Sequence, residues 1–312
     1  MREDYRIVDE LYDGFCQRAP IGLRTPLQRL AHTLGLVPST DVGWSEVFNH
    51  EVTLAAPLVL SDAMPNVEQG IVRDATLAHL LAVIEAFGTD RIEDSQVEGT
   101  ATLRGALGQV RAERDEALSR VAGGAGGPYA EAEAETLAAI RLEREVLSSQ
   151  SSVSIAEYER VSTGKQAVGM PAALALARVA GWAPNRIAML DRTLLAIWFA
   201  LQAHDDVADW QQDAERGGAW AIALAQHKSA GRKMAVDAMV HGSGVLADML
   251  RLSRRRYRAA GTRAAALGAA SLARWCRERE QEVGLLAQLE GRHPGYVIRF
   301  RALSALEHEV LQ

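Results

Sequence analysis

The fold of this chain is decided by Leu201-Gln202-Ala203-His204-Asp205-Asp206-Val207-Ala208-Asp209-Trp210-Gln211-Gln212-Asp213. Asp205, Asp209 and Asp213 recur at every fourth position, so on a helix they share one face and rise about 6 Å at each step. Stacked carboxylates repel one another, and this stretch contains no lysine or arginine to offset their charge. Because Mg²⁺ prefers oxygen ligands and bridges carboxylates to phosphates, the run predicts a Mg²⁺ site.

The residues before the acidic run are apolar on nearly every side. Residues 186–210 include Leu190, Leu194, Leu195, Ile197, Trp198 and Leu201. A helix that is apolar all round belongs in the middle of a bundle. We therefore expect the acidic face to open on an interior cavity. Such a cavity could bind a molecule with a charged head group and an apolar chain. A solvated acidic helix end is the alternative interpretation.

Apolar residues recur at every third and fourth position along most of the chain, which is typical of amphipathic helices. Helices are predicted over residues 71–89, 131–147, 186–210, 234–258 and 262–290. Glycine and proline mark the breaks, of which Gly123 to Pro128 is the clearest. We expect an all-α, single-domain bundle of about ten helices with a central cavity, spanning residues 1–312.

Composition excludes several classes of protein. The net charge of −6 gives no reason to expect a nucleic-acid partner. The two cysteines, Cys16 and Cys276, form no CxxC pair, so a disulfide scaffold or a zinc site is not expected. The sequence shows neither a signal peptide nor an apolar stretch long enough to span a membrane, and a cytoplasmic location is expected.

A second acidic group, Asp90 with Asp94, follows the apolar residues of the helix predicted at 71–89. The two aspartates share a helix face, and Glu93 lies beside Asp94. Two acidic faces across a cavity could hold several Mg²⁺ ions around a diphosphate. The alternative is an ordinary helix terminus in which Asp90 and Arg91 form part of a mixed surface.

Basic residues lie on a third segment, Tyr158 to Lys165, which precedes a helix break at Gly169 and Pro171. The guanidinium of Arg160 could clamp diphosphate oxygens bidentately. The broken helix would free backbone carbonyls that can point at a carbocation. A surface arginine beside a helix kink is the alternative.

Together these segments resemble the class I terpene synthases and the related trans-polyprenyl diphosphate synthases. Residues 201–209 look like the second aspartate motif of the polyprenyl synthases, FQ-x-x-DD-x-x-D. The run from Asp205 to Asp213 is also similar to the metal triad of the terpene synthases. Asp90 and Asp94 fall where the first aspartate-rich motif stands in these families.

The resemblance implies an isoprenoid synthase fold, a prenyl diphosphate substrate, three Mg²⁺ ions and a homodimer. The implied metal ligands are Asp90, Asp94, Asp205, Asp209 and Asp213. Arg160 would sense the diphosphate, and Asp205 and Asp209 would act with it in catalysis. The remaining candidates for substrate binding are Lys165, Gln202, Phe87, Trp198 and Phe199. Each aromatic candidate could instead be plain core.

Two departures from the polyprenyl synthases bear on the reaction. Val52 to Pro57 replaces the usual G-K-R-x-R-P, and Val97 to Gly99 replaces R-R-G. Without those basic residues a second diphosphate has no evident binding site. This favours a one-substrate terpene cyclase acting on a farnesyl- or geranylgeranyl-type diphosphate. The alternatives are a prenyltransferase with an unusual acceptor, a non-catalytic relative acting as a binding subunit, and an unrelated helical bundle.

Overall fold

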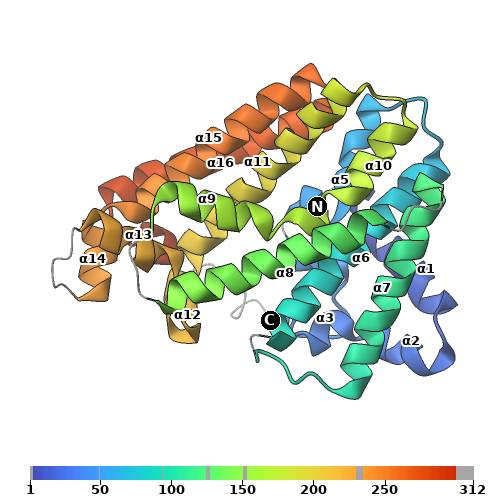
Figure 1. The fold of residues 1–312 in the computed structure, drawn as a ribbon, viewed down its shortest axis with the longest axis horizontal. Helices are drawn as coiled ribbons and strands as arrows, with labels where there is room; N and C mark the ends of the chain where they lie inside the picture. Colours follow the sequence, from blue (N-terminus) through green and yellow to red (C-terminus); the bar gives the residue numbers. More distant parts are fainter. Residues whose placement is uncertain are drawn as a thin grey trace. The chain divides into compact units, whose positions relative to one another are not determined.

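The computed structural model describes residues 3–48, 50–93, 95–123, 127–149, 153–229 and 235–299 (Figure 1). These residues form sixteen α-helices, α1 to α16, and three short 3₁₀ helices, η1 to η3, with no β-strand among them. The predicted all-α class is therefore confirmed. The prediction of about ten helices is wrong, because regions without long periodic runs fold as short helices such as α2 to α4 and α12 to α14.

The chain divides into two compact units. The first comprises the chain up to Glu133, with Val168–Ala188 and Leu267–Leu272. The second comprises Ala134–Ala167, Met189–Ala266 and the chain from Ala273 onward. The expectation of a single domain over the whole chain stays a prediction.

The first unit is built around α6 (Gln69–Glu93). Every residue from 75 to 85 is buried, and α6 packs against four other helices of the unit, α1, α5, α7 and α10. The other elements of this unit are η1 (Glu3–Arg6), α1 (Ile7–Arg18), α2 (Ile21–Gln28), α3 (Leu30–Thr33), α4 (Trp44–Val47), α5 (Glu51–Leu60), η2 (Ser61–Ala63), α7 (Ala101–Ala122) and α10 (Pro171–Val179). Four elements run from one unit into the other: η3 (Ala167–Gly169), α8 (Gly127–Ser148), α11 (Pro184–Ala208) and α16 (Ala270–Arg292).

Both ends of α7 follow from local sequence. The hydroxyl of Thr100 accepts a hydrogen bond from the backbone N–H of Leu103 at 3.2 Å, which caps the first turn. Gly123 ends the helix with a φ of 71°, a left-handed conformation that glycine adopts without strain. The break predicted from Gly123 onward is thus confirmed at its first residue.

A buried ion cluster joins α6, α7 and the first turns of α8. Arg114, whose side chain is 2% exposed, pairs with Glu85 and Glu133, and its guanidinium also bonds Asp115 at 2.7 Å. The guanidinium lies 4.5 Å from the ring centroid of Tyr129. Arg111, whose side chain is 53% exposed, also pairs with Glu85 at 2.5 Å, so Arg114 is the buried cation of the cluster and Arg111 a more solvated one. Removing Arg114 would leave the buried carboxylates only partly compensated.

The interruption of α5 explains a buried histidine. Pro57 has no N–H to donate to the carbonyl of Thr53, and Ala55 leaves the helical region with φ −133° and ψ 30°. His79 of α6, which is fully buried, places Nε2 3.0 Å from that carbonyl oxygen. Burial lowers the pKa of His79 to about 4, so the ring is neutral near pH 7 and can donate the missing hydrogen bond.

The second unit contains the helix that carries the acidic run. Residues 196–201 of α11 are all buried, as the apolar pattern predicts. The hydroxyl of Ser253 donates to the carbonyl of Ala200 at 2.7 Å and joins α15 to α11. The other helices are α9 (Ile155–Gly164), α12 (Trp210–Arg216), α13 (Trp220–Lys228), α14 (Val236–Gly242), α15 (Val245–Ala266) and α16 (Ala270–Arg292), the last beginning in the first unit.

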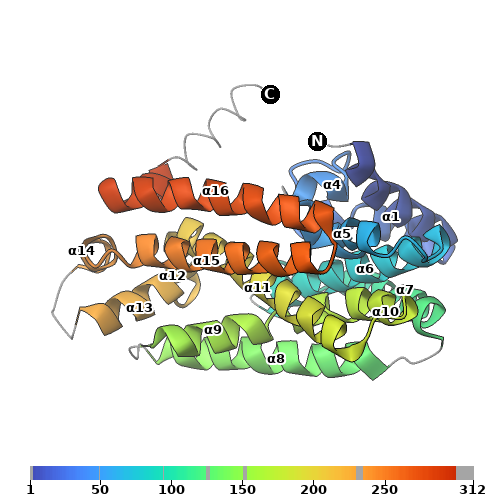
Figure 2. The same cartoon turned by 90° about the horizontal axis from the view of Figure 1, so that it is seen from above.

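Two predicted helix boundaries near the C-terminus are wrong. The break expected between residues 258 and 262 does not occur, because α15 continues to Ala266. The chain turns instead at Gly244, with φ 69°, and at Gly268, with φ 78°. Figures 1 and 2 show α15 and α16 side by side, and a Cβ on Gly261 would lie 3.2 Å from Cβ of Cys276, so the two backbones approach closely.

Among the helices of the described residues, none is both long and apolar enough to cross a membrane.

Candidate active site

The acidic run spans a junction between two helices. Helix α11 ends at Ala208, and Asp209 is the N-cap residue of α12 with φ −110° and ψ 2°. The helix predicted over residues 186–210 therefore ends two residues early, and Asp209 and Asp213 do not continue on α11. Aspartate is a residue that favours such N-cap positions. The N–H groups of Asp209 and Asp213 still donate to the carbonyls four residues earlier, at 2.9 Å and 3.0 Å.

The three predicted metal ligands of the run differ in exposure. Asp205 is exposed, and Asp209 and Asp213 are half-buried. Burial and, to a smaller extent, the charge of Asp209 raise the pKa of Asp213 to about 6, although Arg216 and Lys165 act in the opposite direction. The two carboxylates therefore repel each other, and a bound cation would relieve that repulsion.

The donor set fits Mg²⁺ without forming a closed cage. In the described part of the chain, no group of three or more acidic, histidine or cysteine side chains is arranged to enclose a metal ion. Mg²⁺ is commonly held by one or two carboxylates, with water and substrate phosphates completing its octahedron. Asp205, Asp209 and Asp213 supply carboxylates of that kind at the end of a buried helix.

Asp206 has a different role from its neighbour. It is 6% exposed, and its carboxylate accepts the hydroxyl of Tyr158 at 2.6 Å and the amide of Gln202 at 2.7 Å. Gln166 donates in turn to Gln202 at 3.1 Å. Burial raises the pKa of Asp206 to about 7, a rise that the Tyr158 hydrogen bond reduces. The aspartate that points into the interior is thus Asp206, and it fastens α11 to α9.

Lys165 lies at the end of α9 in a sheltered ion pair. Its Nζ is 2.5 Å from Oε2 of Glu143 on α8, and the two side chains are 19% and 14% exposed. The other oxygen of Glu143 accepts the indole N–H of Trp220 at 2.7 Å. The charge of Lys165 lowers the pKa of both Asp206 and Asp213, so the ion pair lies within electrostatic reach of the acidic run.

The aromatic candidates of α11 are buried. Trp198 is 4% exposed and Phe199 2% exposed. The ring centroid of Phe199 lies 5.5 Å from that of Tyr158, and the guanidinium of Arg256 lies 5.5 Å from the same Phe199 centroid. Arg256 also pairs with Glu159 at 2.7 Å. Phe199 therefore already has a cation over its ring.

The other predicted site residues that the structure describes lie on α9 and at the end of α6. Arg160 is exposed on α9. Asp90 is half-buried near the end of α6, in the first unit, and Asp94 lies outside the described residues. Phe87, on α6, is 39% exposed and packs on Phe48 with ring centroids 4.9 Å apart. A shared site for these residues and the acidic run stays a prediction.

Two residues beside the acidic run were missed by the sequence reasoning, Glu143 and Trp220. Glu143 stands in a charge-rich amphipathic helix, where one glutamate resembles every other. Trp220 follows the Gly217-Gly218 break with no polar pattern around it. Tyr158 belongs to a predicted segment, but its bond to Asp206 joins positions 48 residues apart, a relation that local periodicity does not encode.

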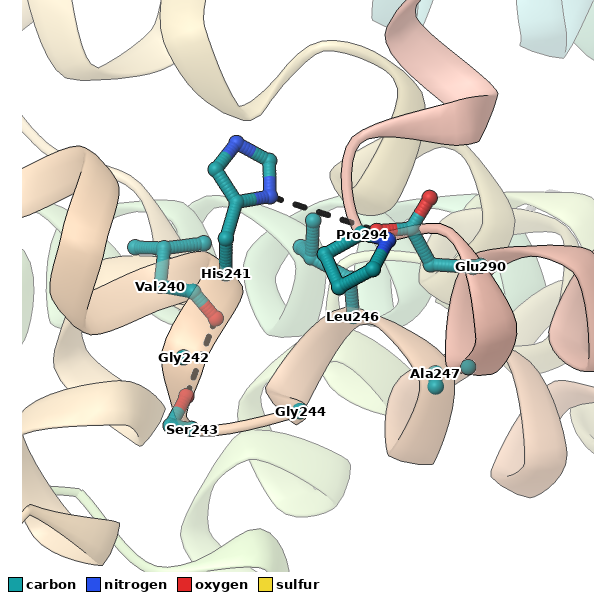
Figure 3. Close-up of a pocket in the computed structure, with 10 residues that line it drawn as sticks. Val240, His241, Gly242, Ser243, Gly244, Leu246, Ala247, Glu290 and Pro294 are labelled. Atoms are coloured by element: carbon teal, nitrogen blue, oxygen red, sulfur yellow. Dashed lines mark hydrogen bonds and ion pairs between the residues drawn. The ribbon is translucent and has the colours of Figure 1, made fainter.

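A small cavity of about 260 Å³ lies elsewhere in the second unit, between the α14–α15 turn and the end of α16 (Figure 3). His241 and Glu290 line it, with Nδ1 and Oε1 4.0 Å apart. Glu290 accepts the N–H groups of Gly295 at 2.6 Å and Val297 at 3.1 Å, so it fixes the turn after α16. None of the predicted site residues lines this cavity.

Solved structures of polyprenyl synthases share this architecture. The chain is similar to a polyprenyl synthetase from Streptomyces coelicolor A3(2), with a TM-score of 0.67, 15% identity, and 90% of this chain and 98% of that chain covered. It is similar to a polyprenyl synthase from Caulobacter crescentus CB15, crystallised with calcium and isoprenyl diphosphate, with a TM-score of 0.64, 16% identity, and 88% and 93% covered. A polyprenyl synthase from Roseobacter denitrificans matches with a TM-score of 0.51, 17% identity, and 88% and 98% covered.

The fold is therefore the all-α fold of the isoprenoid synthases, as the aspartate motif predicts. Within that fold class, the similar structures are polyprenyl synthases. No protein-family profile matches the sequence, and no curated protein matches it.

Proposed function

We propose that this protein is a Mg²⁺-dependent class I isoprenoid enzyme that ionises an allylic prenyl diphosphate. One observation carries the proposal: Asp205, Asp209 and Asp213 lie where a buried apolar helix ends, on the fold that in the Caulobacter polyprenyl synthase holds calcium and isoprenyl diphosphate. Bound Mg²⁺ supplies charge stabilisation to the leaving diphosphate. We also propose that the site binds three Mg²⁺ ions.

The residues around the run have separate tasks in this proposal. Asp205, Asp209 and Asp213 hold the cations. The ammonium of Lys165 and the guanidinium of Arg160 bind diphosphate oxygens. Gln202 holds the buried Asp206, and the apolar bodies of Trp198 and Phe199 exclude water from the cation that forms.

A one-substrate cyclase is our preferred reaction, with a farnesyl- or geranylgeranyl-type substrate. The segment that would carry the basic G-K-R-x-R-P motif forms α5, which contains no lysine or arginine. Val52, Leu54, Ala55, Ala56 and Pro57 of that helix are buried. The products would be a terpene hydrocarbon or alcohol and diphosphate, which makes the enzyme a carbon–oxygen lyase.

A prenyltransferase with an unusual acceptor is the second candidate. It is favoured by the fold comparison, because the similar solved structures are polyprenyl synthases. The two reactions differ in what they require. A cyclase turns over an allylic diphosphate alone, whereas a transferase needs a second substrate.

The test is diphosphate release from single allylic diphosphates of ten to twenty-five carbons, with product extraction and mass spectrometry. The wild type should release diphosphate and form a hydrocarbon or alcohol when Mg²⁺ is present. Asp205→Asn with Asp209→Asn should lower turnover at least ~100-fold with unchanged circular dichroism. Asp237→Asn, at an exposed aspartate of α14, is the matched control and should leave turnover unchanged.

Full activity of the double variant would refute the metal assignment. Release only after isopentenyl diphosphate or another acceptor is added would identify a transferase. No release under any of these conditions would leave the binding-subunit alternative.

A further inference from the structure

The pair of Lys165 and Glu143 suggests a role for a residue outside the aspartate motifs. We propose that Glu143 is a positioning residue. It holds Lys165 away from the acidic run until a diphosphate replaces Glu143 as the partner of Lys165. This inference rests on the proposed diphosphate site. It concerns how the chain keeps a cation-binding acidic run and a diphosphate-binding lysine side by side.

The position of Lys165 is fixed by α8. The hydroxyl of Thr136 donates to the carbonyl of Lys165 at 3.3 Å. A Cβ at the preceding residue, Gly164, would lie 2.9 Å from Cβ of Ala139, so the end of α9 sits directly on α8. The backbone of Lys165 therefore lies next to α8, and its side chain can reach the carboxylate of Glu143.

Glu143 is itself held in place. One oxygen receives the indole N–H of Trp220 while the other pairs with Lys165. Trp220 is 3% exposed and packs on Tyr158 with ring centroids 5.1 Å apart. Because Tyr158 donates to Asp206, the orientation of Glu143 is tied to the helix that carries the acidic run.

The opposite charges of Lys165 and Glu143 affect how strongly the acidic run attracts a cation. The charge of Lys165 acts on Asp206 and Asp213, and the charge of Glu143 opposes it at both. A lysine without Glu143 would turn toward the nearest carboxylates and compete with Mg²⁺ for them. With Glu143 in place, the pair is neutral, and the acidic run keeps its attraction for a divalent cation.

A diphosphate changes the choice of partner. It offers Lys165 more than one negative charge and several acceptor oxygens, whereas Glu143 offers a single charge. Lys165 then exchanges the carboxylate for diphosphate oxygen, and the hydrogen bond from Trp220 keeps Glu143 in position. Glu143 thus competes with diphosphate for Lys165 while favouring the binding of Mg²⁺.

The test is calorimetric titration of the full chain with Mg²⁺ alone and with inorganic pyrophosphate alone. Glu143→Gln keeps an acceptor for Trp220 and loses the charge. We expect it to weaken Mg²⁺ binding about fivefold and to tighten metal-free pyrophosphate binding about fivefold. Glu145→Gln, at an exposed position two residues along α8, removes the same charge and should change neither.

If Glu143 had a merely structural role, Glu143→Gln would bind both Mg²⁺ and pyrophosphate more weakly, and that result would overturn the proposal. Unchanged affinities for both would also overturn it. In a Lys165→Gln background the Glu143→Gln effects should vanish, and their persistence would also overturn it. If the wild type binds neither Mg²⁺ nor pyrophosphate, the proposed function fails as well. A wild type that binds both, with an unaltered Glu143→Gln, refutes this inference alone.

Discussion

His79 should make the stability of the protein depend on pH below neutrality. Its pKa is about 4 in the folded chain, and a histidine in an unfolded chain titrates near ~6.5. Between these values the unfolded chain binds the extra proton, so the free energy of unfolding is undiminished above the upper value and falls as the pH drops toward the lower one. A difference of about 2.5 pKa units corresponds to about 3 kcal/mol, of which about 2 kcal/mol should be lost by pH 5.

The assay is urea unfolding of wild type and His79→Gln at several pH values from 7.5 to about 4.5. Glutamine can still donate to the carbonyl of Thr53 but does not titrate. The wild type should therefore lose about 2 kcal/mol relative to His79→Gln by pH 5 and about 2.5 kcal/mol by the acidic end of this range. His79→Leu, which lacks the donor, should be less stable than His79→Gln at every pH, by about 1–3 kcal/mol. Parallel pH profiles for wild type and His79→Gln would refute the assignment of a neutral buried histidine.

Three further substitutions test other contacts by the same urea unfolding. Arg114→Met takes the buried cation from Glu85, which keeps its pair with the more exposed Arg111, and should cost about 3 kcal/mol; a cost below about 1 kcal/mol would contradict a buried pair. Thr100→Ala removes the cap of α7 and should cost about 1 kcal/mol, whereas an unchanged midpoint would show that the cap is not needed. Tyr158→Phe removes a hydrogen bond to Asp206 and should cost about 2 kcal/mol at pH 8, where that carboxylate is ionised, and less at pH 6; a cost independent of pH would argue against it.

The central helices could be predicted because their evidence is local. The apolar residues before Asp205 require burial all round, and α11 is buried there from 196 to 201. Gly123 and Gly268 end helices with positive φ, although only the first was identified as a break, because a lone glycine also occurs within helices. Periodicity alone thus located the core better than the turns.

The candidate site was only partly readable from the sequence. Asp205 and Asp206 are adjacent letters, but successive helical residues point about 100° apart, so one is exposed and the other buried. The break at Asp209 was missed because aspartate occurs both within helices and at their N-caps. The Lys165–Glu143 pair joins two helices across 22 residues, and nothing in either segment specifies the other.

The junction at Asp209 also bears on which ions the acidic run accepts. Asp213 lies on α12, a seven-residue helix bounded by this junction and by Gly217. A small backbone rotation at Asp209 would move Asp213 relative to Asp205 without unwinding α11. The spacing of the carboxylates is therefore compliant, and we expect the run to accept divalent ions of different ionic radius, so that Mn²⁺ or Ca²⁺ would compete with Mg²⁺ for the same carboxylates.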